Sequence, residues 1–208
     1  MPDEHILELT ALRAIHPRCA FYESCGTQAH IRLSLDPTPL PAGTIKRPVH
    51  VNWVKRPGNR AAVDELREIG WKGLPSDATD LAIRMNRTKN AQVITEWAAI
   101  GVFALLIHDL EGAEIQQVLA IGSGGDYLVL SPGRKRSVQA EIRGIRIDAT
   151  GSTSRSKLGE KKVQVLTKSR VGFASVTTFS HPPGAIVHSY LHYVRKPTRK
   201  RSRKAKRK

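Results

Sequence analysis

The chain has 208 residues, of which 40% are hydrophobic, and a formal net charge of +16. This length suits one well-packed domain with a small appendage. The longest apolar run, at residues 97–107, falls well short of the ~20 residues that a membrane-spanning helix needs, and no signal segment opens the chain. We therefore expect a cytoplasmic protein with no membrane partner, in which Cys19 and Cys25 are idle thiols because their spacing matches no zinc or redox motif.

The first ninety residues alternate strand-like pieces with turn signals, and we expect residues 1–90 to form a β-rich elaboration or a small subdomain. RCAFYESC and AHIRLSL predict a hairpin that turns at Gly26. VHVNWV predicts another strand. Asn59 can cap a helix that Gly70 would close. No chemistry is evident in this part of the chain.

From residue 91 the pattern becomes that of an α/β domain, which we expect over residues 91–195. AQVITEWAAIGVFALLIHDL is apolar almost all round, which is typical of a helix packed between a sheet and other elements. A strand near residues 115–120 and two strand-like runs on either side of Pro132 follow. RSKLGEKKVQVLTKSR predicts a basic helix, and VGFASVTTFS and AIVHSYLHYV predict two more strands. This succession predicts an α/β fold with a central sheet flanked by helices.

The two strand-like runs around Pro132 each carry one acid among apolar neighbours, Asp126 and Glu141. A four-residue loop gives a register in which paired positions sum to 267, and Asp126 then lies opposite Glu141 with Cβ atoms about 4.5–5.5 Å apart. Facing carboxylates repel unless a cation or a shared proton lies between them. On an exposed hairpin water would screen this repulsion, whereas beside an apolar helix a cation such as Mg²⁺ would relieve it. Arg143 projects from the same face as Glu141.

These residues resemble the PD-(D/E)xK nuclease superfamily, the fold of many restriction endonucleases, in which an acid opens one strand and Glu-X-Lys lies on the next. The resemblance covers about residues 92–179, because the preceding helix carries Glu96 early and a helix and a strand follow the hairpin. It implies a restriction-endonuclease-like core with a mixed central sheet, and Mg²⁺ bound by Asp126 and Glu141. Glu96 would assist through a water molecule, and Arg143 would occupy the position of the family's lysine.

Arg143 departs from the family pattern because an arginine cannot lose its proton at neutral pH. It can still stabilise an anionic transition state. Alternatively the lysine has moved to the following helix, where Lys157, Lys161 and Lys162 are the candidates. In the third reading, catalysis is lost and the fold is kept for binding. The sequence leaves open whether the chain is an enzyme, and the catalytic candidates are Asp126, Glu141, Arg143, Glu96 and Lys157.

The chain ends in a polybasic tail, RKPTRKRSRKAKRK, whose ten basic residues leave a net charge of +6 for the rest of the chain. Such a run repels itself and buries nothing, so we expect residues 196–208 to be disordered in isolation. Lysine and arginine contact phosphates without specifying a sequence, and the tail has no aromatic residue on which a base could stack. The tail predicts DNA or RNA as the partner, although a purely solubilising role would need none. The expected contacts are Lys196, Arg199, Lys200, Arg201, Arg203, Lys204, Lys206, Arg207 and Lys208.

The sequence thus predicts a nucleic-acid-directed protein and leaves its activity open. The first hypothesis is a Mg²⁺-dependent endonuclease. The alternative is a non-catalytic DNA- or RNA-binding protein with a degenerate nuclease fold, or an RNA-associated structural component. The chemistry of the two acids and the nearby cations distinguishes them, because cleavage requires a metal site and binding does not.

Overall fold

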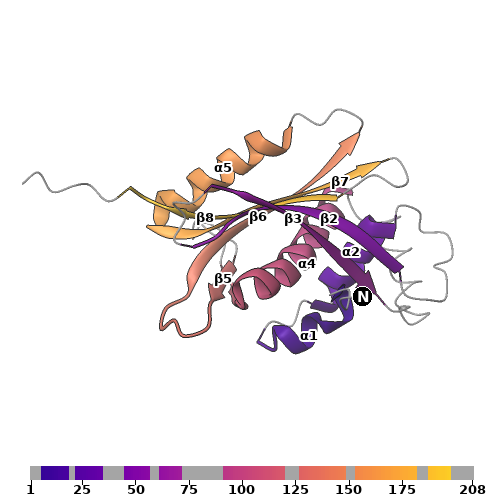
Figure 1. The fold of residues 1–208 in the computed structure, drawn as a ribbon, viewed down its shortest axis with the longest axis horizontal. Helices are drawn as coiled ribbons and strands as arrows, with labels where there is room; N and C mark the ends of the chain where they lie inside the picture. Colours follow the sequence, from indigo (N-terminus) through magenta and orange to yellow (C-terminus); the bar gives the residue numbers. More distant parts are fainter. Residues whose placement is uncertain are drawn as a thin grey trace, which may run out of the picture.

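A single mixed sheet of eight strands, with helices on both faces, organises the chain (Figure 1). The computed structural model describes residues 6–18, 22–34, 45–56, 61–71, 91–119, 127–148, 153–181 and 187–197. In chain order the elements are β1 (Ile6–Glu8), a 3-10 turn (Leu9–Ala11), α1 (Leu12–Ile15), α2 (Tyr22–Ser34), β2 (Ile45–Val54), β3 (Val63–Trp71), α4 (Ala91–Glu111), β4 (Glu114–Val118), β5 (Tyr127–Leu130), β6 (Val138–Asp148), α5 (Thr153–Lys168), β7 (Val171–His181) and β8 (Val187–Arg195).

The strands lie side by side in the order β1-β3-β2-β8-β7-β6-β5-β4. Strands β4, β5 and β6 are antiparallel neighbours, as short connections require. Strand β7 pairs parallel to β6, and α5 provides the crossover that a parallel pair needs. Strand β8 is antiparallel to β7 and parallel to β2, so the strands of the first ninety residues extend the sheet that the later strands begin.

The central helix α4 is buried along nearly its whole length, as its apolar sequence predicts. It packs against α2 on one side and against β6 and β7 on the other. A Cβ at Gly101 would lie 2.9 Å from the carbonyl oxygen of Cys25, so glycine allows α2 and α4 to approach closely. Residues 92–111 are also long and apolar enough to cross a membrane by length and composition alone, but most of this stretch is buried inside the fold.

The two faces of the sheet are covered unequally. Helices α1, α2 and α4 lie on one face and α5 lies on the other, as Figure 1 shows. The larger core lies on the α4 side and includes Phe103, Trp71 and Phe173. The smaller core lies under α5, where Leu158 and Val165 of the helix pack with residues of β7 and β8. Strand β6, which carries the candidate site, is held in the sheet between these two cores.

The α/β expectation is confirmed, because the structure has one mixed sheet flanked by helices. The expected strand at VHVNWV is β2, and the expected apolar helix is α4. The strand, hairpin, helix and two strands expected beyond α4 are also present, as β4, β5 with β6, α5, β7 and β8.

Two predictions for the first ninety residues are wrong. The predicted hairpin at Gly26 is the helix α2, in which Cys25, Ala29 and Leu33 are buried at the four-residue spacing of a helix face. The predicted helix from Asn59 to Glu68 is wrong from Val63 onward, where the chain forms the strand β3; Asn59 itself lies outside the described residues. Along β3 the residues before Ile69 are exposed or half-buried and only the last three are buried, so the polar first part resembles a solvated helix.

Cys25 is buried in the core. Cys19 lies outside the described residues.

Candidate functional site

The hairpin of β5 and β6 has the register that its apolar pattern predicts. Tyr127 pairs with Ala140 and Val129 with Val138, so paired positions sum to 267 as expected. Asp126 precedes the first described residue of β5 and lies outside the described part of the chain. Its predicted position opposite Glu141 therefore stays a prediction.

The faces of β6 alternate between the two helix layers. Ala140 and Ile142 belong to the core on the α4 side. Gly144 also faces α4, and a Cβ there would overlap the carbonyl oxygen of Thr95, so the first turns of α4 lie directly against β6. Glu141 therefore faces α5, as alternation along a strand requires.

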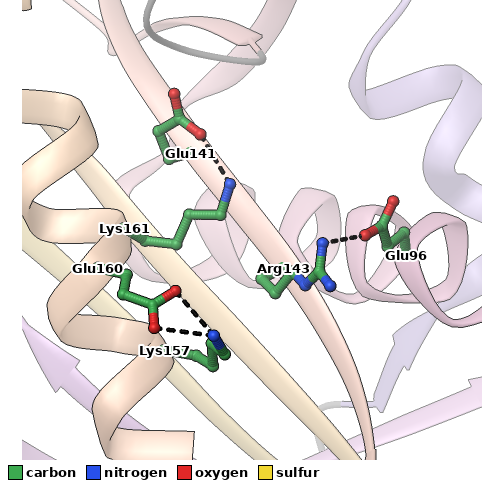
Figure 2. A network of polar contacts seen from close by, with 6 residues as sticks. All are labelled: Glu96, Glu141, Arg143, Lys157, Glu160 and Lys161. Atoms are coloured by element: carbon green, nitrogen blue, oxygen red, sulfur yellow. Dashed lines mark hydrogen bonds and ion pairs between the residues drawn. The ribbon is translucent and has the colours of Figure 1, made fainter. Parts of the chain in front are cut away.

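Glu141 forms a buried ion pair with Lys161 of α5. The Lys161 Nζ donates to Glu141 Oε2 over 2.8 Å, and the two side chains are only 15% and 7% exposed (Figure 2). A buried carboxylate is costly unless it is paired and hydrogen-bonded. Lys161 meets that need because it lies on the same stripe of α5 as Leu158 and Val165, which pack on the sheet.

Arg143 lies two residues beyond Glu141 but contacts a different helix. Its Nη1 donates to Oε1 of Glu96, which α4 places beside β6. Figure 2 shows the arginine turned toward α4 and away from Lys161. Both side chains are about one-third exposed, so water screens this ion pair far more than the pair of Glu141 and Lys161.

The other two candidate lysines of α5 do not contact Glu141. Lys157 donates to both carboxylate oxygens of Glu160, at 2.8 and 2.9 Å, on the exposed side of the helix. Lys162 has a pKa lowered by burial, and its charge contributes to the lowered pKa of His192 on β8. Of the lysines proposed from the sequence, Lys161 is therefore the one that the structure brings to Glu141.

A cavity of about 390 Å³ opens along the edge of β6, next to the beginning of α4. We call it the β6-edge cavity. Within the described residues β5 pairs with β6 only as far as Ala140, so the cavity lies beyond the end of that pairing. Its lining includes Gln92, Thr95, Gly144, Arg143, Arg146 and Lys157.

The described side chains offer part of a metal site. Glu141 supplies a carboxylate, the hard oxygen donor that Mg²⁺ prefers, and the neighbouring ammonium of Lys161 offsets its charge. Glu96, the second described carboxylate of the predicted set, is bound by Arg143. No group of three or more His, Cys, Asp or Glu side chains converges within the described residues. The donor chemistry of Glu141 fits Mg²⁺, and the ligand set would require Asp126 as well.

The tail contributes one described residue to the predicted nucleic-acid contacts. Lys196 is exposed, and its backbone N–H donates to the carbonyl oxygen of Arg170 over 2.9 Å. This bond fixes the point from which the tail leaves the sheet. The remaining predicted contacts, from Arg199 to Lys208, lie outside the described residues.

Sequence reasoning left Lys161 as one of three candidates and did not single out Arg146. The spacing of Leu158, Lys161, Lys162 and Val165 is that of one helix face and indicates which lysines point to the sheet. The position of Arg146 carried no such signal, because the cavity that it lines depends on the close approach of α4 to β6 at Gly144.

Comparison of the chain with models of protein families, with curated proteins and with solved structures finds no match.

Proposed function

We propose that this chain is a nucleic-acid-directed protein with a restriction-endonuclease-like core, residues 91–195, that cleaves phosphodiester bonds with Mg²⁺. The order of elements supports the proposal: α4, the antiparallel strands β4, β5 and β6, then α5, then β7 parallel to β6. This order includes the helix, hairpin, helix and strand on which the resemblance to the PD-(D/E)xK superfamily rests.

The observation that carries the proposal is the buried ion pair between Glu141 and Lys161. A buried ion pair adds little to stability compared with apolar residues of similar volume. Stability alone therefore does not explain why this ion pair is present. A carboxylate and an ammonium side by side supply a metal ligand and a positive charge, and phosphodiester hydrolysis needs both. We therefore assign the role of the family's lysine to Lys161 in preference to Arg143 or Lys157.

In the proposed mechanism Asp126 and Glu141 would hold the metal, and when bound it would supply Lewis-acid chemistry at the phosphate. Lys161 donates hydrogen bonds to a non-bridging phosphate oxygen. Its charge stabilises the negative charge that develops there in the transition state. Arg143, held in place by Glu96, adds a second positive charge along the same strand.

The ion pair of Arg143 with Glu96 favours a second candidate function, a non-catalytic DNA- or RNA-binding protein. It engages two of the residues to which the resemblance gives catalytic roles. In this alternative the cations of β6, α5 and the tail bind phosphates without cutting the chain. Its signature is salt-dependent binding with no cleavage in any divalent metal.

The test is cleavage of DNA and RNA of mixed sequence in Mg²⁺ or Mn²⁺ by the full chain, beside Glu141→Gln and Asp126→Asn. We expect each substitution to lower the rate at least ~100-fold, because each removes a metal ligand. Lys135→Met is the control, since Lys135 is exposed in the loop between β5 and β6. Tight binding by the wild-type chain without any cleavage would replace this proposal with the second candidate.

A further inference from the structure

The β6-edge cavity combines a volume typical of a ligand site with a one-sided charge. Its volume of about 390 Å³ falls within the ~300–1,000 Å³ of small-molecule sites. Three of its lining side chains are cationic, Arg143, Arg146 and Lys157, and no carboxylate is among the described residues of its lining. Such a cavity is suited to an anion.

The three cations come from two different elements, which spreads their positive charge around the cavity. Arg143 and Arg146 belong to β6 and Lys157 belongs to α5. The two arginines lie on opposite faces of β6 because side chains alternate along a strand. The cavity therefore reaches around the edge of β6. Burial, with a smaller contribution from the charge of Arg146, lowers the pKa of Arg32 on α2.

The nearby carboxylates orient these cations without cancelling them. Glu96 binds one nitrogen of Arg143, whose guanidinium carries five N–H donors in all. Glu160 binds Lys157 on the exposed side of α5, where both side chains are about half exposed. Among the described residues, two carboxylates, Glu96 and Glu160, thus accompany the three cations of the cavity lining.

The distances of Arg143 and Arg146 from Glu141 along β6 fit the spacing of phosphates along a nucleic-acid backbone. Arg143 lies two residues along β6 from Glu141 and Arg146 lies five, which correspond to roughly 7 and 16 Å at about 3.3 Å per residue. One strand of B-DNA carries a phosphate about every 3.4 Å along the helix axis. A phosphate roughly two to five nucleotides from the one at Glu141 would therefore reach the cavity.

We propose that the β6-edge cavity binds a backbone phosphate of the nucleic acid at a position away from the cleaved bond, through Arg143, Arg146 and Lys157. This inference rests on the proposed direction toward nucleic acid but not on cleavage. The cavity thus positions the nucleic-acid strand along β6, and the proposed cleavage takes place at Glu141 and Lys161.

The test measures binding of a short fluorescein-labelled oligonucleotide, as DNA and as RNA, to the full chain in EDTA over a range of salt concentrations. For Arg146→Gln with Lys157→Gln we expect weaker binding, and a slope of log affinity against log salt that is smaller by about 0.7–0.9 than that of the wild-type chain, because the contact with one phosphate is lost. The expectation follows from about 0.7 per phosphate contact on single strands and 0.9 on B-DNA.

The matched control is Arg136→Gln with Lys135→Gln, which removes the same charge from exposed residues of the β5–β6 loop. We expect this control to keep the wild-type slope. Equal losses in the two double variants would contradict the proposal by showing that only net charge matters. A wild-type slope in the cavity variant, or no binding to either oligonucleotide, would also contradict it.

The same variants separate this inference from the proposed function. Glu141→Gln should abolish cleavage and keep the wild-type salt slope, because it leaves the cavity intact. If the cavity variant loses the salt slope and no protein cleaves, the cavity proposal stands and the nuclease proposal fails. If the cavity variant binds like the wild-type chain while Glu141→Gln loses cleavage, the reverse holds.

Discussion

Two ion pairs on one strand differ in almost every physical respect, although their β6 residues are only two positions apart. Glu141 pairs with Lys161 of α5 and is 5% exposed. Arg143 pairs with Glu96 of α4, and both side chains are about one-third exposed. The first pair lies inside the fold, whereas the second lies at the edge of β6 beside an open cavity.

Within the proposed function, this difference is the basis for giving chemistry to one pair and positioning to the other. Two charges inside the protein interact strongly, because water screens them little. Separating them costs much free energy, because each charge would then be buried without its partner. Two charges at the surface interact weakly and can reorient toward a ligand. We therefore assign catalysis to Glu141 and Lys161 and strand positioning to Arg143.

The largest expected effect is on stability when the buried pair is broken. Lys161→Met leaves the Glu141 carboxylate buried beside an apolar side chain, and we expect a loss of about 3–5 kcal/mol in the free energy of unfolding. Urea denaturation measures it. Combining Lys161→Met with Glu141→Leu should recover most of the loss, because no buried charge remains. A loss below about 1 kcal/mol for Lys161→Met would mean that the pair is solvated like a surface one.

The loss of stability on acidification allows a comparison of the two faces of the sheet, because each face carries a buried histidine away from the two ion pairs. Burial lowers the pKa of His30 of α2, which packs on Trp71 of β3, to about 4. Burial and the charge of Lys162 likewise lower the pKa of His192, on the α5 side, to about 4.

Because the unfolded chain binds a proton at each histidine below a pKa of about 6.5, stability is full above that pH and falls as the pH drops toward 4. We expect a loss on the order of 3 kcal/mol for each histidine. Thermal melting between pH 7 and 4 measures the loss, and His30→Gln should remove the share from the α4 side. Melting temperatures that stay constant over this range would contradict the lowered pKa values.

The smallest expected effect is at the exposed pair. A double-mutant cycle with Arg143→Gln and Glu96→Gln should give a coupling energy of about 0–1 kcal/mol, and added salt should reduce it. The measurement is the free energy of unfolding of the four proteins at low and high salt. A coupling above about 2 kcal/mol would show that the pair is desolvated and would remove the contrast with Glu141 and Lys161.

The sequence predicts the local geometry of the hairpin better than the site as a whole. The register that pairs Tyr127 with Ala140 follows from the alternation of apolar residues, which is a local signal. The partner of Glu141 depends on the rotation of α5 against the sheet, which is set by the packing of Leu158 and Val165. That packing is a tertiary effect, so the sequence limits the lysine to a few candidates without choosing among them.

The errors in the first ninety residues have a related cause. Gly26 is typical of a turn, but in α2 it faces Leu12, where a Cβ would be in ordinary contact. The helix is held by the packing of its buried face on α4, which outweighs the local preference of its residues. Burial of Cys25 and Ala29 against Gly101 is a contact between segments far apart in the sequence, and no local pattern reveals it.

The most direct test of the account compares cleavage by Lys161→Met and Arg143→Met at saturating substrate, with Mg²⁺ present and at a temperature where circular dichroism shows both variants folded. We predict that Lys161→Met loses at least ~100-fold in rate, as expected for removal of a charge that stabilises the transition state, and that Arg143→Met keeps a rate near that of the wild-type chain with a raised KM. Loss of the rate in Arg143→Met, with Lys161→Met unaffected, would contradict the assignment of catalysis to the buried pair.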